Sequence, residues 1–218
     1  MPAGQYRIKG TADQRARARH QLRTELLTAA REIADESGGF EKVTMRAVAD
    51  RVGYTAPILY QSFANKQALL IGLLDVGFAE LADRLGRAQS PELPHGSTSA
   101  LGPIAAAYWE FASGNPHLYR LMHSLPDVPF GTPDAPPSAA RCFEVLKTAV
   151  KTAAADHPAT AYDDDAATDL LWAQMHGLVS LMLDGRMKGG PARGRDLLQI
   201  LTDTFTTATR TQAPHSSR

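Results

Sequence analysis

Two short helical segments on either side of a glycine constrain the fold of this chain more than any other feature. Thr44 is a good N-cap for a helix that ends near Val52, and Gly53 supplies the turn that follows. Thr55 caps the next segment, which makes Pro57 its second helical residue. A proline there removes no intrahelical hydrogen bond, because the first backbone N–H groups of a helix have no partner. Two such short helices joined by a tight turn predict a helix-turn-helix.

Helical periodicity continues along the rest of the chain, and no segment shows the alternation of a strand. The fold class is therefore predicted as all-α, with about nine helices, at residues 11–37, 44–52, a short one from 55, 66–88, 100–113, 117–125, 137–155, 163–185 and 194–210. Loops rich in Pro, Gly and Ser are expected at 89–99 and 126–138. The predicted domains are a flexible arm at 1–12, a three-helix domain with the helix-turn-helix at 13–66, a second helical domain at 67–211 and a disordered tail at 212–218.

Charge is distributed unevenly although the formal net charge is +0. Residues 1–70 carry 11 Lys and Arg against 7 Asp and Glu, whereas the remainder carries 12 against 16. A basic front favours an anionic partner for that part of the chain. Four arginines of the first helix contribute to it: Arg15, Arg17, Arg19 and Arg23.

The single Cys142 excludes an internal disulfide and a cysteine-based metal site. With no signal-peptide core and no run of apolar residues long enough for a bilayer, we expect a cytoplasmic protein without a membrane partner.

The helix-turn-helix divides into an inner and an outer face. Ala47, Val48 and Val52 are expected to form the inner face, and the small Ala49 allows the second helix to cross closely. Ile58 and Leu59 are expected to face the same core, which leaves one side of the second short helix to face a groove of DNA. Phosphate contacts are expected from polar and basic side chains around the motif. The candidate DNA-contacting residues are Thr44, Arg46, Thr55, Ala56, Pro57, Tyr60, Gln61 and Lys66.

The stretch "LLTAAREIADESGGFEKVTMRAVADRVGYTAPILYQSFANKQALL" resembles the DNA-binding domain of the TetR family of transcriptional regulators. That family has a Thr that opens the second helix, a small residue and then a Gly near the turn, and a Leu-Tyr-x-x-Phe run before a lysine. The matching residues here are Thr44, Ala49, Gly53, Leu59, Tyr60, Phe63 and Lys66. Three positions depart from the pattern, namely Tyr54, Pro57 and Ser62, and these bear on base and phosphate contacts rather than on the fold.

The second part of the chain resembles, more weakly, the ligand-binding and dimerisation region of one TetR subgroup. The resemblance rests on "YWEFASGNPHLYRLM" and on Trp172, His176 and Gly177. It implies a homodimer formed by the last two helices. Apolar stripes at helical spacing independently allow such a contact: Leu170, Leu171, Leu178, Leu181, Met182, Leu197, Leu201, Thr204 and Phe205.

Aromatic, sulfur and imidazole groups in the second part make it a candidate for a small-molecule pocket. The candidate ligand-binding residues are Tyr108, Phe111, Tyr119, Met122, His123, Trp172, Met175 and His176. The same side chains would serve equally well as a packed core. No cofactor is implied, and His117 and His123 do not share a helical face, so no metal site is expected.

These expectations combine into a homodimeric repressor that binds a palindromic double-stranded DNA operator and is released by an unknown small-molecule effector. Repression is the commoner role in the family, and the sequence does not distinguish it from activation. The alternative is a helical enzyme, or a ligand-binding protein that uses the C-terminal cavity without DNA. The sequence lacks a Ser/His/Asp signature and a phosphate loop, and the carboxylates of "YDDDAATD" are explained by a helix N-terminus, so we expect no enzyme.

Overall fold

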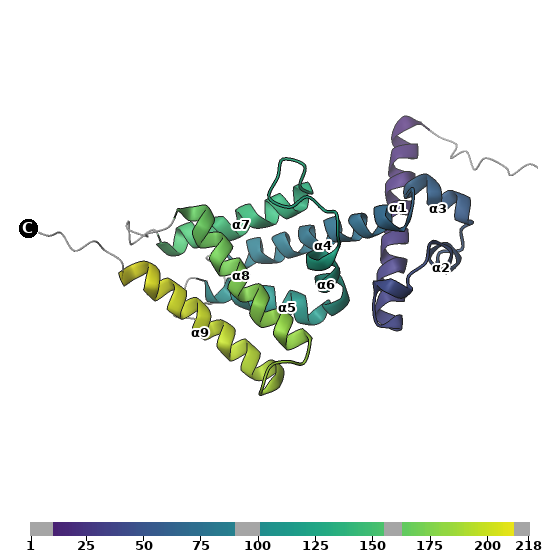
Figure 1. Ribbon diagram of the computed structural model, residues 1–218. Helices are drawn as coiled ribbons and strands as arrows, with labels where there is room; N and C mark the ends of the chain where they lie inside the picture. The colour runs from purple at the N-terminus through teal and green to yellow at the C-terminus, as the bar shows by residue number, and fades with distance from the viewer. Residues whose placement is uncertain (1–10, 90–100, 155–162, 212–218) are drawn as a thin grey trace, which may run out of the picture. The chain divides into compact units, whose positions relative to one another are not determined.

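The computed structural model describes residues 11–89, 101–154 and 163–211, and within them the chain is all-α, as predicted (Figure 1). The described residues form nine α-helices, one short 3₁₀ helix and no strand. The helices are α1 (Ala12–Ser37), η1 (Phe40–Lys42), α2 (Met45–Arg51), α3 (Ala56–Ser62), α4 (Lys66–Ala88), α5 (Gly102–Gly114), α6 (Pro116–Ser124), α7 (Pro137–Ala154), α8 (Asp164–Leu183) and α9 (Gly190–Thr211). Most of the predicted arm, nearly all of the predicted loop at 89–99, and the predicted tail lie outside the described residues.

The described residues divide into two compact units. The first unit contains the residues up to Leu74 together with Leu121–Val128. The second unit contains Asp75–Arg120 and the residues from Pro129 onward. Helices α4 and α6 each contribute residues to both units. No helix of the described part is both long and apolar enough to cross a membrane.

Helix ends in the first unit follow the capping residues of the sequence. The Thr44 hydroxyl accepts a hydrogen bond from the Ala47 N–H at 3.1 Å, and Asn65 Oδ1 accepts one from the Ala68 N–H at 2.8 Å. Gly38 ends α1 with a φ of 85°, a conformation that glycine adopts without a steric penalty. Thr55 occupies the predicted N-cap position of α3, but its side chain makes no capping hydrogen bond. The short helix η1 was not predicted.

The first unit is held together by small and branched side chains where α2 and α3 pack on α1. Helices of seven residues are not stable alone in water, so their stability comes from this packing. Val48 and Leu59 are fully buried, and so are Leu26 and Ala30 of α1. Burial of each large apolar side chain contributes about 1.5–3 kcal/mol. Figure 1 shows α2 and α3 beside α1. This packing fixes which side of α3 remains exposed.

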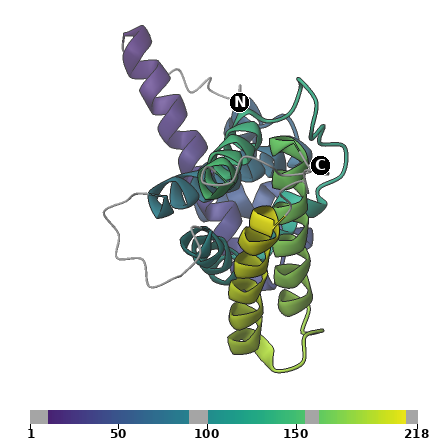
Figure 2. The ribbon, with the colours of Figure 1, turned by 90° about the vertical axis from the view of Figure 1, so that its left-hand side faces the viewer.

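The second unit is built around α5, α8 and α9. Helices α8 and α9 lie side by side and run in opposite directions (Figures 1 and 2). Helix α9 begins at Gly190, four residues before the predicted start, because Pro191 fits the first turn of a helix and Gly189 adopts a φ of 88°. Trp109 of α5 is 2% exposed and lies against Gly194 of α9. The absence of a side chain at position 194 therefore lets the indole occupy the space between the two helices.

We expect Gly194→Ala to destabilise the second unit, because a Cβ there would overlap the Trp109 ring. Overpacking of this kind lowers the free energy of unfolding by about 1–3 kcal/mol. Gly86→Ala is the matched control: it lies in α4 with open space around the added Cβ, so helix propensity should raise the stability by up to about 1 kcal/mol. Both tryptophans, Trp109 and Trp172, belong to this unit, so tryptophan fluorescence during denaturation follows it. A Gly194→Ala protein as stable as Gly86→Ala would contradict the packing described.

Candidate DNA-binding surface and ligand pocket

Helix α3 presents one side to solvent and buries the other. Leu59 is fully buried, whereas Tyr60 is 51% exposed and Gln61 is exposed beside it. At the start of the helix Thr55 and Pro57 are also exposed, and Ala56 is partly buried. The five residues predicted to face DNA on this helix thus lie on or next to its solvent side. Their arrangement leaves hydroxyl, amide and phenol groups available to a partner.

Two further candidate residues lie at the start of α2. The Thr44 hydroxyl acts as the helix cap, so its remaining acceptor and its proton are what it can offer to DNA. The Arg46 side chain is 90% exposed, and its Nε lies 3.7 Å from Asp50 Oδ2. A surface ion pair of this kind contributes about 0–1 kcal/mol, so the guanidinium can leave it for a phosphate at little cost.

Lys66 has a structural role that the sequence did not reveal. Its Nζ donates a hydrogen bond to the Glu41 carbonyl oxygen at 2.9 Å, which ties the start of α4 to η1. Lys42 makes a similar contact, from its Nζ to the Ser37 carbonyl oxygen at 2.7 Å. Through these hydrogen bonds each lysine helps to hold neighbouring segments of the first unit together.

The four arginines in the first half of α1 separate into two groups. Arg15, Arg17 and Arg19 are exposed on the first half of the helix. Arg23 instead donates from Nη1 to the Ser62 carbonyl oxygen at 3.3 Å, and its guanidinium lies 4.3 Å from the centre of the Phe63 ring. Arg23 thus holds the end of α3, where an exposed carbonyl and an aromatic face attract a cation.

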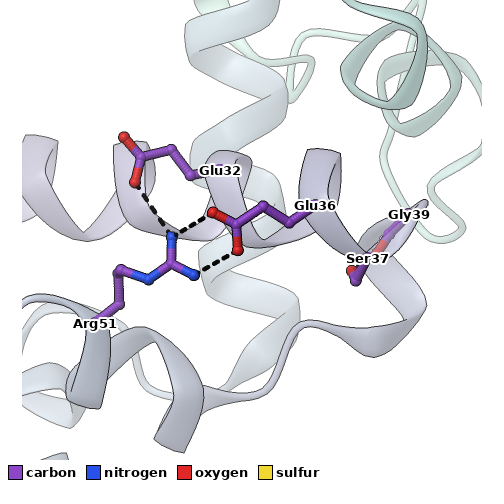
Figure 3. Close-up of polar contacts among 5 residues, drawn as sticks. All are labelled: Glu32, Glu36, Ser37, Gly39 and Arg51. Carbon is purple, nitrogen blue, oxygen red and sulfur yellow. Dashed lines mark hydrogen bonds and ion pairs between the residues drawn. The ribbon is translucent and has the colours of Figure 1, made fainter.

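An ion pair joins α2 to α1 on the surface of the first unit. Arg51 binds Glu36 through two hydrogen bonds, of 3.0 Å and 2.6 Å, and lies 3.5 Å from Glu32 (Figure 3). The hydrogen bond from Arg51 holds the pKa of the Glu36 carboxyl below its usual value of 4.5. Two parallel N–H···O bonds constrain the relative orientation of the two groups, so this contact adds a polar link between α2 and α1 to their apolar packing.

A cavity of about 380 Å³ lies within the second unit. Helices α4, α5, α7 and α8 line it, together with the loop before α7. The lining residues are Phe78, Leu81, Leu85, Tyr108, Phe130, Gly131, Thr132, Ala135, Ala139, Ala140, Cys142, Phe143, Glu144, Leu146, Asp165, Asp169 and Trp172. Its size falls in the range of about 300–1,000 Å³ that is typical of small-molecule sites. Burial raises the pKa of the Cys142 thiol to about 12, so this cysteine acts as an apolar wall.

Two of the eight predicted ligand-binding residues, Tyr108 and Trp172, line this cavity. Phe111 and Met175 are fully buried, which agrees with core packing. Met122 and His123 belong to the first unit, and the cavity has no residue of that unit in its lining. The eight candidate residues include none from α4, from α7 or from the loop that carries Phe130. An isolated aromatic residue in a proline-rich loop was the available signal.

Tyr119 and His176 do not line the cavity but are linked to it through hydrogen bonds. The Tyr108 and Tyr119 hydroxyls lie 2.8 Å apart, the Tyr119 hydroxyl lies 2.7 Å from His176 Nδ1, and His176 Nε2 lies 3.3 Å from Ser180 Oγ. Burial lowers the pKa of His176, so its imidazole is neutral, with one nitrogen that accepts and one that donates. Burial also raises the pKa of both tyrosines, which therefore remain hydroxyl donors. Trp172 also shares a hydrogen bond with Tyr108, so the chain of contacts begins at the cavity wall.

The family of the chain is decided by two sequence matches. The family model described as bacterial regulatory proteins of the tetR family matches residues 26–73. A second model, described as a tetracyclin repressor-like C-terminal domain, matches residues 101–205. The chain belongs to the TetR family. It is therefore a DNA-binding transcriptional regulator and not an enzyme.

Solved structures share the fold at low sequence identity. A protein of unknown function from Rhodococcus sp. RHA1 aligns with a TM-score of 0.72 and 23% identity, over 95% of this chain and 100% of that one. A TetR transcriptional regulator from the same organism aligns with a TM-score of 0.59 and 22% identity, over 88% and 97%. A TetR variant from Acinetobacter baumannii AYE in complex with minocycline gives 0.57 and 20%, over 84% and 92%. Comparison with curated proteins gave no match.

The two family matches cover different helices of the chain. The first match contains the helix-turn-helix, α2 and α3, and the second match covers the helices that line the cavity from α5 onward. Among the described residues, no group of three or more His, Cys, Asp and Glu side chains is placed to hold a metal ion. The carboxylates of "DDD" at the start of α8 have a structural role, since Asp163 Oδ1 accepts a hydrogen bond from the Ala166 N–H at 2.7 Å.

We expect Glu36→Gln to loosen α2 at neutral pH and to have no effect in acid. Because the pKa of Glu36 is lower in the folded state, its stabilising contribution is complete above the usual value of 4.5 and is lost as the pH falls through the lowered pKa. Hydrogen exchange of the α2 amides measures the difference between wild type and variant across this pH window. A difference that persists unchanged well below that window would contradict the role of the ion pair.

Proposed function

We propose that this TetR-family chain is a homodimeric repressor that binds a palindromic operator in the cytoplasm and is released when a small molecule occupies its cavity. The exposed side of α3 is the observation that carries the proposal. A helix of seven residues reads few base pairs, so useful specificity requires two copies on two half-sites about one helical turn or more apart. Arg46 and the exposed arginines of α1 supply charge for phosphate contacts.

A partner surface on α8 and α9 supports the dimer. Leu170 and Leu181 of α8 are 41% and 47% exposed, and Ile200 of α9 is 58% exposed. Gly177 lies between the two leucines on the same side of α8, and a Cβ added there meets no atom within 4 Å. Exposed apolar residues around a glycine suit a close helix contact with a second copy of the chain.

The cavity supports control by a small molecule. The A. baumannii relative is a TetR variant bound to minocycline, and the cavity here has a size suited to a ligand. An effector that binds a second conformation better than the operator-binding one shifts the population away from DNA. A coupling of about 1–3 kcal/mol changes operator affinity roughly 5- to 150-fold. Helix α4 contributes to both units and is the expected route.

The DNA-binding role is tested with duplexes that the protein enriches from a random pool. Tyr60→Ala and Gln61→Ala should each weaken binding to the enriched duplex by about 1–3 kcal/mol and relax its sequence preference. Arg46→Ala should instead weaken binding to all duplexes and lower the dependence of log K on log salt concentration by about 1. Thr28→Ala, an exposed position in the middle of α1, is the control and should bind as wild type does. Normal binding by both α3 variants would reject α3 as the reading helix.

The dimer is tested at Gly177. Because the Cβ enters open space within one chain, Gly177→Ala should not disturb the fold of the monomer, and helix propensity should stabilise it by up to about 1 kcal/mol. Across a close α8 contact the same methyl group should weaken the dimer, which sedimentation over a range of concentrations measures. Gly86→Ala, also in open space, is the matched control and should leave the dimer unchanged. Equal dimer dissociation constants for the two variants would place the interface elsewhere.

A further inference from the structure

The cavity of the second unit combines an aromatic wall with an acidic lining. Five aromatic side chains border it, from α4, α5, the loop before α7, α7 and α8: Phe78, Tyr108, Phe130, Phe143 and Trp172. The rings of Phe78 and Phe130 meet edge to face, with their centres 5.6 Å apart. Aromatic faces carry partial negative charge, so they bind both flat ring systems and cations.

Three carboxylates belong to the lining of the cavity: Glu144 of α7 and Asp165 and Asp169 of α8. The lining contains no Lys, Arg or His. These three acids are exposed, whereas Leu81, Leu85, Tyr108, Cys142 and Leu146 are buried. The apolar part of the cavity therefore lies inside, and the negative charges lie where it opens to solvent.

The three carboxylates are not equivalent. Lys147 Nζ lies 2.5 Å from Asp165 Oδ1, so the charge of Asp165 is balanced within the protein. Glu144 and Asp169 remain as the net negative charge of the lining. Asp169 and Trp172 are three residues apart on α8, which places a carboxylate and an indole on the same side of the helix.

We propose that the cavity binds a planar aromatic cation, with its rings among Phe78, Tyr108 and Trp172 and its positive charge near Glu144 and Asp169. The apolar interior excludes a small hydrated ion, because it offers no polar group to replace water. An anionic ligand would meet two carboxylates and no basic side chain in the lining. A neutral aromatic ligand would fill the cavity but leave the carboxylates unused. Binding of this ligand does not depend on the proposed function, but a role for it as the effector does.

The test compares three ligands with the same three-ring frame and different charges. N-methylacridinium carries a positive charge, acridine is neutral at pH 8, and anthracene-9-carboxylate is negative. Binding to the full chain without DNA is measured by titration calorimetry. The cation should bind at least about tenfold more tightly than acridine, and the anion should bind most weakly. The preference for the cation should decrease as salt is added, because the carboxylates are exposed.

Variants assign the charge preference to the cavity. Glu144→Gln with Asp169→Asn keeps the shape of both side chains, so it should reduce the preference for the cation about tenfold and leave the affinity for acridine unchanged. Glu110→Gln removes an exposed carboxylate of the same unit outside the lining and should change neither affinity. Trp172→Leu should weaken all three ligands, since it removes part of the aromatic wall.

Equal affinity for the cation and acridine, tighter binding of the anion, or no binding of any of the three would each overturn the inference. So would a cation preference that survives in the double carboxylate variant. Because no DNA is present, these outcomes are independent of the regulatory response. The proposed function fails separately if a bound cation leaves operator affinity unchanged.

Discussion

The surface that we propose reads DNA depends on the packing of two seven-residue helices against α1. Neither α2 nor α3 is long enough to be stable by itself, so the side chains that point inward decide the position of those that point outward. Leu59 is fully buried, and the next residue, Tyr60, is exposed for that reason. Arg23 adds a polar contact from α1 to the end of α3, and Arg51 adds one from α2 to α1. Both guanidinium groups therefore make contacts within the first unit, and the proposed phosphate contacts rest on Arg46 and the exposed arginines of α1.

Polar side chains of the second unit form two groups, one in the lining of the cavity and one behind it. Carboxylates line the opening of the cavity, whereas Tyr119 and His176 lie behind the wall and bond to one another at 2.7 Å. Tyr108 belongs to both groups, because its ring lines the cavity and its hydroxyl meets Tyr119. A ligand that displaces the Tyr108 ring would thus disturb a hydrogen-bonded chain that ends on α8. Buried chains of this kind tolerate few alternative arrangements, since each member left without its partner costs free energy.

Local signals in the sequence were sufficient for the α-helices of the described residues and for the solvent side of α3. Capping residues, glycines and helical periodicity act over a few residues, so Thr44, Gly38 and Pro57 located helix ends in advance. The cavity could not be predicted in the same way, because its lining comes from five segments that only the folded chain brings together. Lys66 illustrates the limit: its position in the motif suggested a phosphate contact, but its bond to the Glu41 carbonyl depends on η1, which has no clear sequence signal.

Hydrogen exchange of the full chain, with and without an enriched duplex, tests the central claim most directly. The surface that we propose meets DNA is the exposed side of α3 together with the start of α2. We expect slower exchange on the duplex at the amides of residues 44–47, 55, 56 and 58–61, and no slowing at the cavity wall formed by α7. Bound duplex with unchanged exchange in α3, and protection in another part of the chain, would contradict it.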